Sequence, residues 1–256
     1  AANDPVHKLG LDLANQRVLS GALGNAILWD WATGRVLQRF PASAQWLSSV
    51  AISPDGQTAL IGAAGEIALW QIATGEQLHR LVGHQSQIRT IAYSADGQTA
   101  FSADKAGHLL TWNLAEGQQT QACQVLHKSS QTVWSVAFRD DGGLALVSME
   151  DLAPTGAEAP SVSLWDLPAC QLIRRFVGHQ DAVYWVALSS DQTTALTGSA
   201  DRSIILWDLA TGQPLRHFTG HTLPVHTVAY GTDGQTILSG SEDQTIRLWD
   251  VNTGAE

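Results

Sequence analysis

Basic residues are scarce in this sequence. It contains 14 lysines and arginines against 24 aspartates and glutamates, which gives a formal net charge of −10. Neutralising the phosphates of a nucleic acid requires clustered cations, and binding to an anionic lipid surface requires them as well. The composition therefore predicts a protein that binds neither nucleic acid nor a charged membrane surface.

Cysteines and long apolar runs are also nearly absent. The two cysteines, Cys123 and Cys170, are too few for a disulfide framework and lack the CxxC spacing of a zinc site. We expect two free thiols in a reducing compartment, and hence a cytoplasmic location. No run of about 18 apolar residues occurs, so no membrane-spanning helix is predicted. Residues 1–10 lack the apolar stretch of a signal peptide.

The sequence is instead rich in tryptophan at regular intervals. Six segments centred on tryptophan recur, and successive tryptophans are 41, 42, 53, 42 and 42 residues apart. A period near 42 that covers nearly the whole chain indicates a repeat architecture without a separate second domain. The one long interval indicates an insertion in the fourth repeat. The six segments are Leu28-Trp29-Asp30, Leu69-Trp70-Gln71, Thr111-Trp112-Asn113, Leu164-Trp165-Asp166, Leu206-Trp207-Asp208 and Leu248-Trp249-Asp250.

Each repeat has the pattern of short strands. Apolar residues alternate on both sides of the pair Asp96-Gly97, and Asp-Gly between two alternating segments is typical of a hairpin turn. The fifth repeat has Asp191-Gln192 at this point, and the first has Ala14-Asn15. A second turn follows most tryptophan segments, as at Thr211-Gly212. With a third loop between them, these turns predict four strands in each repeat.

These features together resemble the WD-repeat (WD40) family: four strands, a Gly-His pair before the first strand and a Trp-Asp pair in the third. The best copies are residues 178–208 and 220–250. The resemblance implies an all-β fold, a β-propeller of four-stranded antiparallel blades, in a single domain over residues 1–256. The last of the six visible blades is expected to lack its outer strand. The blades are expected near residues 1–40, 41–81, 82–126, 127–176, 177–218 and 219–256.

The two ends of the chain bear on how such a ring would close. The sixth repeat stops at Glu256, before its fourth strand, and the residues before Val6 are too few for a closing strand. An open sheet edge is an aggregation liability. We therefore expect the chain to be a piece of a longer polypeptide with a seventh blade. A six-bladed ring with an incomplete last blade is the alternative.

The resemblance also implies a polar network in each well-preserved repeat. A His before the first strand, a Ser or Thr ending the second, an Asp in the next turn and the Trp of the third are linked by hydrogen bonds, which a buried indole N–H and imidazole need. The set recurs with a tryptophan in several repeats, so we interpret it as a packing device rather than a hydrolase triad. The other three repeats depart from this pattern; for example, Met149 stands at the Ser position of the fourth. The predicted networks are His84, Ser102, Asp104 and Trp112; His179, Ser199, Asp201 and Trp207; and His221, Ser241, Asp243 and Trp249.

The partner-binding surface is expected on the face that the family calls the top. Residues flanking the first apolar position of each innermost strand point there, and in this chain they include the Trp, Tyr and Arg types that dominate binding hot spots. The alternatives are that these aromatics fill the channel or pack between blades, and that Trp185 reflects local repacking. The insertion at 152–160 is expected on the same face, as part of the binding side or as a loop without a role. The predicted binding residues are Trp46, Arg89, Trp134, Tyr184, Trp185, His226 and Glu242.

The function that the resemblance implies is a scaffold that binds protein or peptide partners. The segments 208–213 and 239–243 look like bacterial WD-repeat proteins, in which propellers are often joined to signalling ATPases or kinases. We therefore expect a sensor or interaction domain of a larger signalling protein, with no catalytic residue, metal or cofactor. The alternatives are a propeller enzyme that uses the central channel, with His226 and Glu242 as scattered candidates, and a structural domain that docks to its own parent chain.

Overall fold

The computed structural model describes residues 8–126, 131–151 and 161–256. These residues form strands and turns and contain no helix, which confirms the all-β prediction and leaves no helix that could span a membrane in this part of the chain. The insertion at 152–160 lies outside the described residues. The chain divides into two compact units, residues 1–125 and 126–256, and each contains three repeats.

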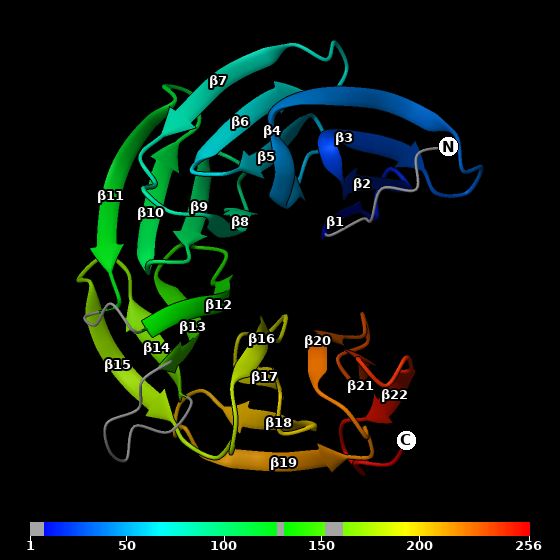
Figure 1. Cartoon of the computed structure of the whole chain (residues 1–256), viewed down its shortest axis with the longest axis vertical. Helices are drawn as coiled ribbons and strands as arrows, with labels where there is room; N and C mark the ends of the chain where they lie inside the picture. The colour runs from blue at the N-terminus through cyan, green and yellow to red at the C-terminus, as the bar shows by residue number, and fades with distance from the viewer. Residues whose placement is uncertain (1–7, 127–130, 152–160) are drawn as a thin grey trace. The chain divides into compact units, whose positions relative to one another are not determined.

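The unit of residues 1–125 consists of antiparallel strands that pair in chain order (Figure 1). The long strand β4 (Val36–Ile52) belongs to two repeats, because it pairs with β3 from Val36 to Trp46 and with β5 from Leu47 onwards. The first repeat adds β1 (Lys8–Asp12), β2 (Arg17–Gly21) and β3 (Leu23–Asp30). The second adds β5 (Thr58–Ala63), β6 (Glu66–Gln71) and β7 (Gln77–Val82). The third consists of β8 (Ile88–Tyr93), β9 (Thr99–Asp104), β10 (His108–Asn113) and β11 (Gln118–Gln124).

The unit of residues 126–256 repeats the same pattern in three separate sheets. The fourth repeat consists of β12 (Gln131–Phe138), β13 (Leu144–Asp151), β14 (Ser161–Asp166) and β15 (Gln171–Phe176). The fifth consists of β16 (Val183–Leu188), β17 (Thr194–Ser199), β18 (Ser203–Asp208) and β19 (Pro214–Thr219). The sixth has three strands among the described residues, which are β20 (Val225–Tyr230), β21 (Thr236–Ser241) and β22 (Ile246–Asp250).

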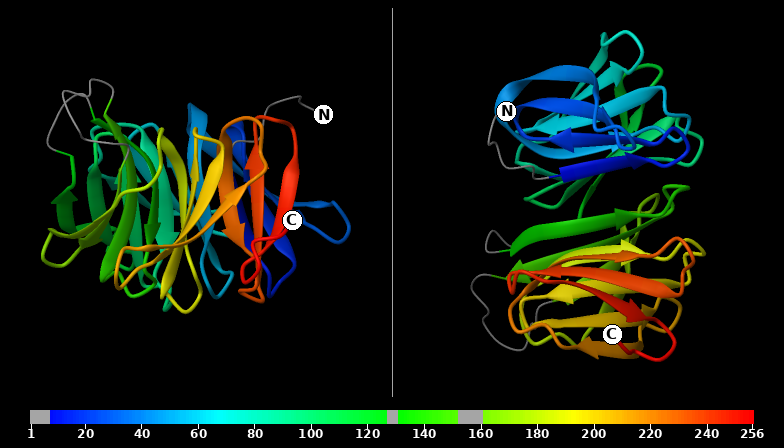
Figure 2. Two further views of the ribbon diagram at one scale, coloured as in Figure 1. Left: turned by 90° about the horizontal axis from the view of Figure 1, so that it is seen from below. Right: turned by 90° about the vertical axis from the view of Figure 1, so that its right-hand side faces the viewer.

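The hydrophobic core of each unit lies between successive repeats. The innermost strands β1, β4 and β8 are neighbours in the first unit, and β12, β16 and β20 are neighbours in the second. Figure 2 shows the strands within each unit side by side, joined by short turns at their ends. Each buried cluster combines two repeats; Leu196 and Ile204 of the fifth repeat, for example, pack with Val225 and Val228 of the sixth. Burial between facing sheets is therefore what joins one repeat to the next.

The turns lie where the sequence pattern places them, including the two that lack Asp-Gly. Glycine occupies the left-handed position in the regular hairpins, as at Gly97 with φ of 70°. Gln192 takes this conformation in the fifth repeat with φ of 59°, and Gln16 takes it in the first with φ of 54°. Side-chain hydrogen bonds help to hold such turns; Ser189 Oγ, for example, donates to Asp191 at 2.6 Å. The same contact occurs in the Asp-Gly hairpins, as between Ser94 and Asp96, so the turn of the fifth repeat keeps its form with glutamine in place of glycine.

The polar network of the third repeat joins the four residues that the sequence pattern named. His84 Nε2 lies 2.6 Å from Ser102 Oγ, and Trp112 Nε1 donates to the same hydroxyl at 2.8 Å. The other ring nitrogen of His84 lies 3.2 Å from Asp104, which also contacts His108 Nδ1 at 2.9 Å. One buried hydroxyl therefore satisfies both an indole and an imidazole.

In the fifth and sixth repeats the prediction of the hydroxyl residue was wrong by two positions. Thr197, not Ser199, contacts His179 Nε2 at 2.7 Å and accepts from Trp207 Nε1 at 2.9 Å. Ser239, not Ser241, does the same for His221 and Trp249, at 2.7 and 2.8 Å. In these repeats the Asp lies in the turn after the second strand, four residues after the hydroxyl, whereas Asp104 lies only two residues after Ser102. Counting back from the Asp therefore led to the wrong serine. Ser199 and Ser241 instead cap that turn, and their hydroxyls accept from the backbone N–H of Asp201 and Asp243.

The aspartates of these networks are held as carboxylates. Burial alone would raise the pKa of Asp201, but hydrogen bonds from His179 and Ser203 outweigh it and bring the pKa well below the ordinary value. Asp104 has a lowered pKa for the same reasons, with His84 and His108 as its partners. Such a carboxylate is available near neutral pH to orient the histidine that in turn contacts the hydroxyl.

The glycine of each Gly-His pair is required by the tryptophan. A Cβ atom on Gly178 would lie 2.8 Å from Trp207 Cη2, closer than real carbon contacts allow. On its other side Trp207 packs edge-on against Phe176 of the preceding repeat, with ring centroids 5.6 Å apart. Phe218 and Trp249 repeat this contact at 5.9 Å. The indole therefore packs against both its own repeat and the repeat before it.

The expectation of two free thiols was wrong. Cys123 and Cys170 are both disulfide-bonded in the structure. Two cysteines far apart in sequence carry no spacing signal, which is why the composition alone predicted free thiols.

We predict that Thr197→Val destabilises the chain by about 1–3 kcal/mol. Valine keeps the shape of the buried threonine but leaves Trp207 Nε1 and His179 Nε2 without their partner. Chemical denaturation followed by tryptophan fluorescence measures the effect. Thr197→Ser keeps the hydroxyl and is the matched control, expected to remain closer to wild type. Equal stability of Thr197→Val and wild type would contradict this role of the hydroxyl.

Candidate functional site

The innermost strands share a distortion that re-aims one side chain in each repeat. The pairing between the first and second strands shifts register by one residue in five of the six repeats. Such β-bulges leave one residue unpaired and turn its side chain out of the regular alternation. The unpaired residues are Ser48, Arg89, Trp134, Tyr184 and His226, so four of the seven predicted binding residues occupy this position.

In the second unit the bulged residues of three successive repeats touch one another. The edge of Trp134 meets Tyr184, with ring centroids 5.0 Å apart and planes at 65°. Tyr184 stacks on His226 at 4.9 Å, with an angle of only 3° between the rings. We call Trp134, Tyr184 and His226 the aromatic row. It crosses the fourth, fifth and sixth repeats through residues that are far apart in sequence.

A glutamate lies at each end of the aromatic row. Trp134 Nε1 donates to Glu150 Oε2 at 2.9 Å, and His226 Nε2 lies 2.7 Å from Glu242 Oε1. The sequence pattern named Glu242 but missed Glu150. The alignment of Met149 with Ser241 already placed Glu150 at the position of Glu242, and the strand pairing gives the same register. Glu150 was nevertheless not among the predicted binding residues.

Negative charge converges on the central ring of the row. Burial raises the pKa of Tyr184 above its ordinary value of 10.0, and the charges of Glu150, Asp181 and Glu242 raise it further. Among the described residues the Tyr184 hydroxyl has no hydrogen-bond partner. The end of the row at His226 is open to solvent, since the side chains of His226 and Glu242 are 48% and 53% exposed. The row therefore presents rings, a free hydroxyl and two carboxylates on one surface.

Trp185 does not belong to this surface. It follows the bulge, and its half-buried ring packs against the core that includes Val225 and Val228 of the sixth repeat. It also lines a shallow hollow with Thr227 and Tyr230. This placement favours local repacking between two repeats over partner binding.

In the third repeat the bulged position carries a cation. Arg89 is half-buried on β8, and burial lowers the pKa of its guanidinium. Lys8 on β1 is more deeply buried, and burial together with the charge of Arg89 lowers its pKa to about 8. The side chain of Trp46 lies outside the described residues. The first unit therefore places two basic groups near one another on its innermost strands.

The buried polar networks are not arranged as a metal site or as a nucleophile beside its base. Among the described residues no three His, Cys, Asp or Glu side chains are grouped so that they could hold a metal ion. The His–hydroxyl–Asp sets are buried and are each shared with a tryptophan, so their hydroxyls already accept the indole N–H. A nucleophile needs an accessible oxygen next to its base, which these sets do not offer.

Comparison with known families locates the same repeats. The family described as WD domain, G-beta repeat (WD40) matches residues 75–113, 170–208 and 212–250. These three matches support a WD40 family. The WD40 matches end in the third, fifth and sixth repeats, which hold the complete His, hydroxyl, Asp and Trp networks. WD40 repeats generally mediate protein–protein interaction, and WD40 proteins are typically non-enzymatic scaffolds. No curated protein matches the chain.

We predict that Glu150→Gln lowers the pKa of Tyr184 toward 10.0. A negative charge near a phenol disfavours the phenolate, so its removal makes ionisation easier. Glutamine keeps an oxygen that can accept from Trp134. NMR titration of tyrosine labelled at Cζ, assigned with Tyr184→Phe, measures the change.

Asp140→Asn in the exposed turn of the fourth repeat is the control, and it should leave the titration of Tyr184 unchanged. A titration midpoint that is the same in Glu150→Gln and wild type would show that Glu150 does not act on Tyr184.

Proposed function

We propose that this chain is a protein-interaction scaffold whose second unit binds a basic segment of a partner protein on the aromatic row. The observation that carries the proposal is the contact between Trp134, Tyr184 and His226, each displaced by a β-bulge and flanked by Glu150 and Glu242. Three bulges in successive repeats that bring three rings together form a surface that packing of the strands does not require. The WD40 matches support the general role of protein binding.

A basic partner segment fits the chemistry of the row. The face of an aromatic ring attracts a guanidinium or ammonium group, and a carboxylate beside it can form a charge-assisted hydrogen bond to the same group. The raised pKa of Tyr184 reflects burial and the negative charges around it, and that negative potential favours an approaching cation. The net charge of −10 adds long-range attraction for a basic partner.

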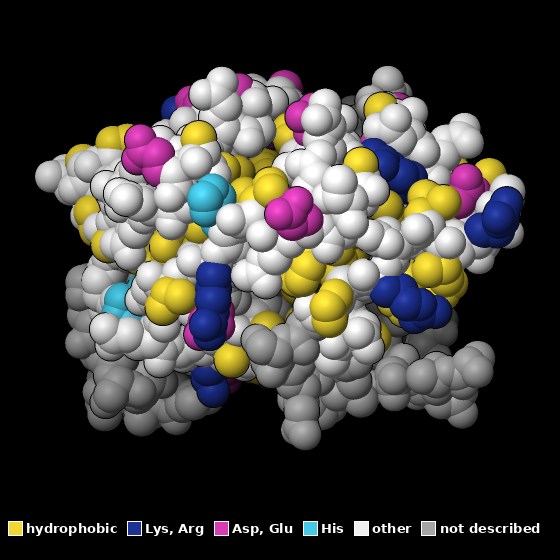
Figure 3. Space-filling model, turned by 90° about the horizontal axis from the view of Figure 1, so that it is seen from above, with side chains coloured by type: hydrophobic (Ala, Val, Ile, Leu, Met, Phe, Trp, Pro, Cys, Tyr) yellow, Lys and Arg dark blue, Asp and Glu magenta, His cyan; other side chains and the backbone are white. Residues whose placement is uncertain are grey.

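We propose a protein partner rather than a nucleic acid. Phosphate binding needs clustered cations. On the face shown in Figure 3, Lys and Arg side chains of the described residues lie among acidic and uncharged ones. We also propose that the chain serves within a larger signalling protein. This finer role is supported by the similarity of segments 208–213 and 239–243 to bacterial WD-repeat proteins and rests on analogy alone.

The test is selection of random 12-residue peptides on the immobilised protein, followed by titration of enriched peptides. We predict that enriched peptides contain Lys or Arg. We predict that Tyr184→Ala weakens their binding by about tenfold or more, as expected for a central aromatic in an interface. Binding should also weaken as ionic strength rises, because salt screens the contribution of the two glutamates.

Trp31→Ala is the matched control, because Trp31 is an exposed tryptophan in a turn of the first unit, 45% accessible to solvent. This variant should bind as wild type does. Enriched peptides without basic residues, or equal binding by Tyr184→Ala and wild type, would overturn the proposal.

A further inference from the structure

One of the six repeating tryptophans lacks the hydrogen bond that the other five make. Trp70 is 8% exposed, and its Nε1 is buried without a hydrogen-bond partner among the described residues. The other five indoles each donate to a hydroxyl at 2.8–2.9 Å. The acceptors are Ser20 for Trp29, Ser102 for Trp112, Ser163 for Trp165, Thr197 for Trp207 and Ser239 for Trp249.

The strand register shows why the acceptor is missing in the second repeat. The hydroxyl residue normally stands on the second strand, opposite the residue two positions before the tryptophan, as Thr197 stands opposite Ile205. In the second repeat Ile61 takes this place, opposite Ala68. The fourth repeat also lacks a hydroxyl on the second strand, but Ser163 supplies one from the third strand. Ala68 stands at the position of Ser163 and has no hydroxyl to supply.

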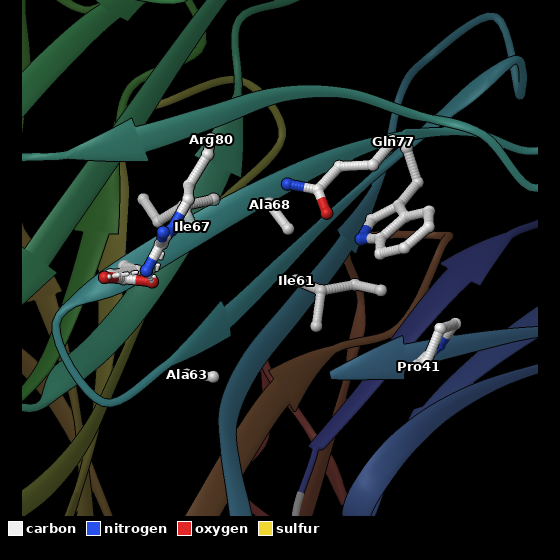
Figure 4. Close-up of a pocket in the computed structure, with 9 residues that line it drawn as sticks. Pro41, Ile61, Ala63, Ile67, Ala68, Gln77 and Arg80 are labelled. Atoms are coloured by element: carbon white, nitrogen blue, oxygen red, sulfur yellow. Dashed lines mark hydrogen bonds and ion pairs between the residues drawn. The ribbon is translucent and has the colours of Figure 1, made fainter. Parts of the chain in front are cut away.

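The unsatisfied indole borders a cavity within the first unit. A hollow of about 400 Å³ is lined by Trp70 together with Ile61, Ala63, Ile67, Ala68 and Pro41 (Figure 4). Ile61 and Ala68, the residues that replace the hydroxyl acceptors, both line it. The lining is thus mostly apolar, with a buried N–H donor among its residues. A buried donor without a partner costs about 1–3 kcal/mol, so an acceptor that entered the cavity would be favoured.

The polar groups of the cavity point to a neutral ligand. Glu66 and Arg80 line the cavity and pair with each other, with Arg80 Nε donating to Glu66 Oε2 at 2.7 Å. Their side chains are 34% and 60% exposed, which places the ion pair at the open side. Because each charge compensates the other, neither selects a charged ligand. The remaining polar side chain is the amide of Gln77, which Figure 4 shows on the same side of the cavity as Ala68.

We propose that this cavity binds a neutral, mainly aliphatic compound that carries a carbonyl oxygen. Because Trp70 Nε1 is buried in the structure, the indole shifts slightly to donate its hydrogen bond to the carbonyl. The aliphatic part contacts Ala68 and Pro41, the apolar lining residues that are accessible. Pockets for small ligands in proteins are of this size and are lined in this way, by apolar groups with few placed polar ones. The site lies within the first unit and is independent of the aromatic row in the second.

The test uses two probes of the same shape, acetylcyclohexane and isopropenylcyclohexane, of which only the ketone has an acceptor. The protein is labelled with ¹⁵N at tryptophan, and the indole signal of Trp70 is assigned with Trp70→Phe. We predict that the ketone shifts the Trp70 signal in a saturable way. The alkene should bind about tenfold more weakly, because it leaves the indole donor unsatisfied.

The variant Ile61→Thr supplies the missing hydroxyl from within the chain. We predict that it weakens ketone binding about tenfold, because Trp70 then has a partner. Ala68→Ile fills the cavity without adding a hydroxyl and should abolish binding of both probes, which keeps the test decisive if Ile61→Thr folds poorly. A Trp70 signal that does not respond to the ketone would overturn the proposal. Equal affinity for ketone and alkene would also overturn it.

Discussion

A hydrogen bond from a buried tryptophan to a hydroxyl is the interaction on which the rest of this structure depends. Each repeating indole lies in the third strand of its repeat. Three of these indoles also pack against a Phe on the last strand of the preceding repeat. Its N–H must find an acceptor within a dry interface. In the third, fifth and sixth repeats a histidine shares that acceptor and an aspartate orients the histidine. The Gly-His and Trp-Asp segments therefore recur together, because each part is needed to bury the indole.

The same framework explains where distinctive surfaces arise. Repetition fixes the interior positions but leaves the bulged residue of each innermost strand free to vary, from Ser48 and Arg89 to Trp134, Tyr184 and His226. Three of these residues lie in contact in the second unit and form the aromatic row. The second repeat departs from the pattern in its interior rather than at its surface. Without a hydroxyl beside Trp70, the interior gains a cavity with an unsatisfied donor.

Much of this could be predicted from sequence because the tryptophan period is so regular. The all-β prediction and the hairpin turns follow from spacing and alternation, and the candidate residues of the aromatic row follow from the resemblance to WD-repeat proteins. Ring closure and the number of blades remain predictions. The errors have physical causes. The Asp lies two residues further from the hydroxyl in the fifth and sixth repeats than in the third, which led to Ser199 and Ser241 in place of Thr197 and Ser239. Glu150 was passed over although it stands at the position of Glu242. The unsatisfied Trp70 could be recognised only once Ile61 and Ala68 were seen to stand opposite each other.

Hydrogen exchange of the indole N–H groups tests the central claim most directly. If hydroxyl acceptors hold the repeating tryptophans, the indole protons of Trp112, Trp207 and Trp249 should exchange slowly, close to the rate of global unfolding. The proton of Trp70, buried but without an acceptor and beside a cavity, should exchange markedly faster than these three. A Trp70 proton protected as strongly as that of Trp207 would contradict the account.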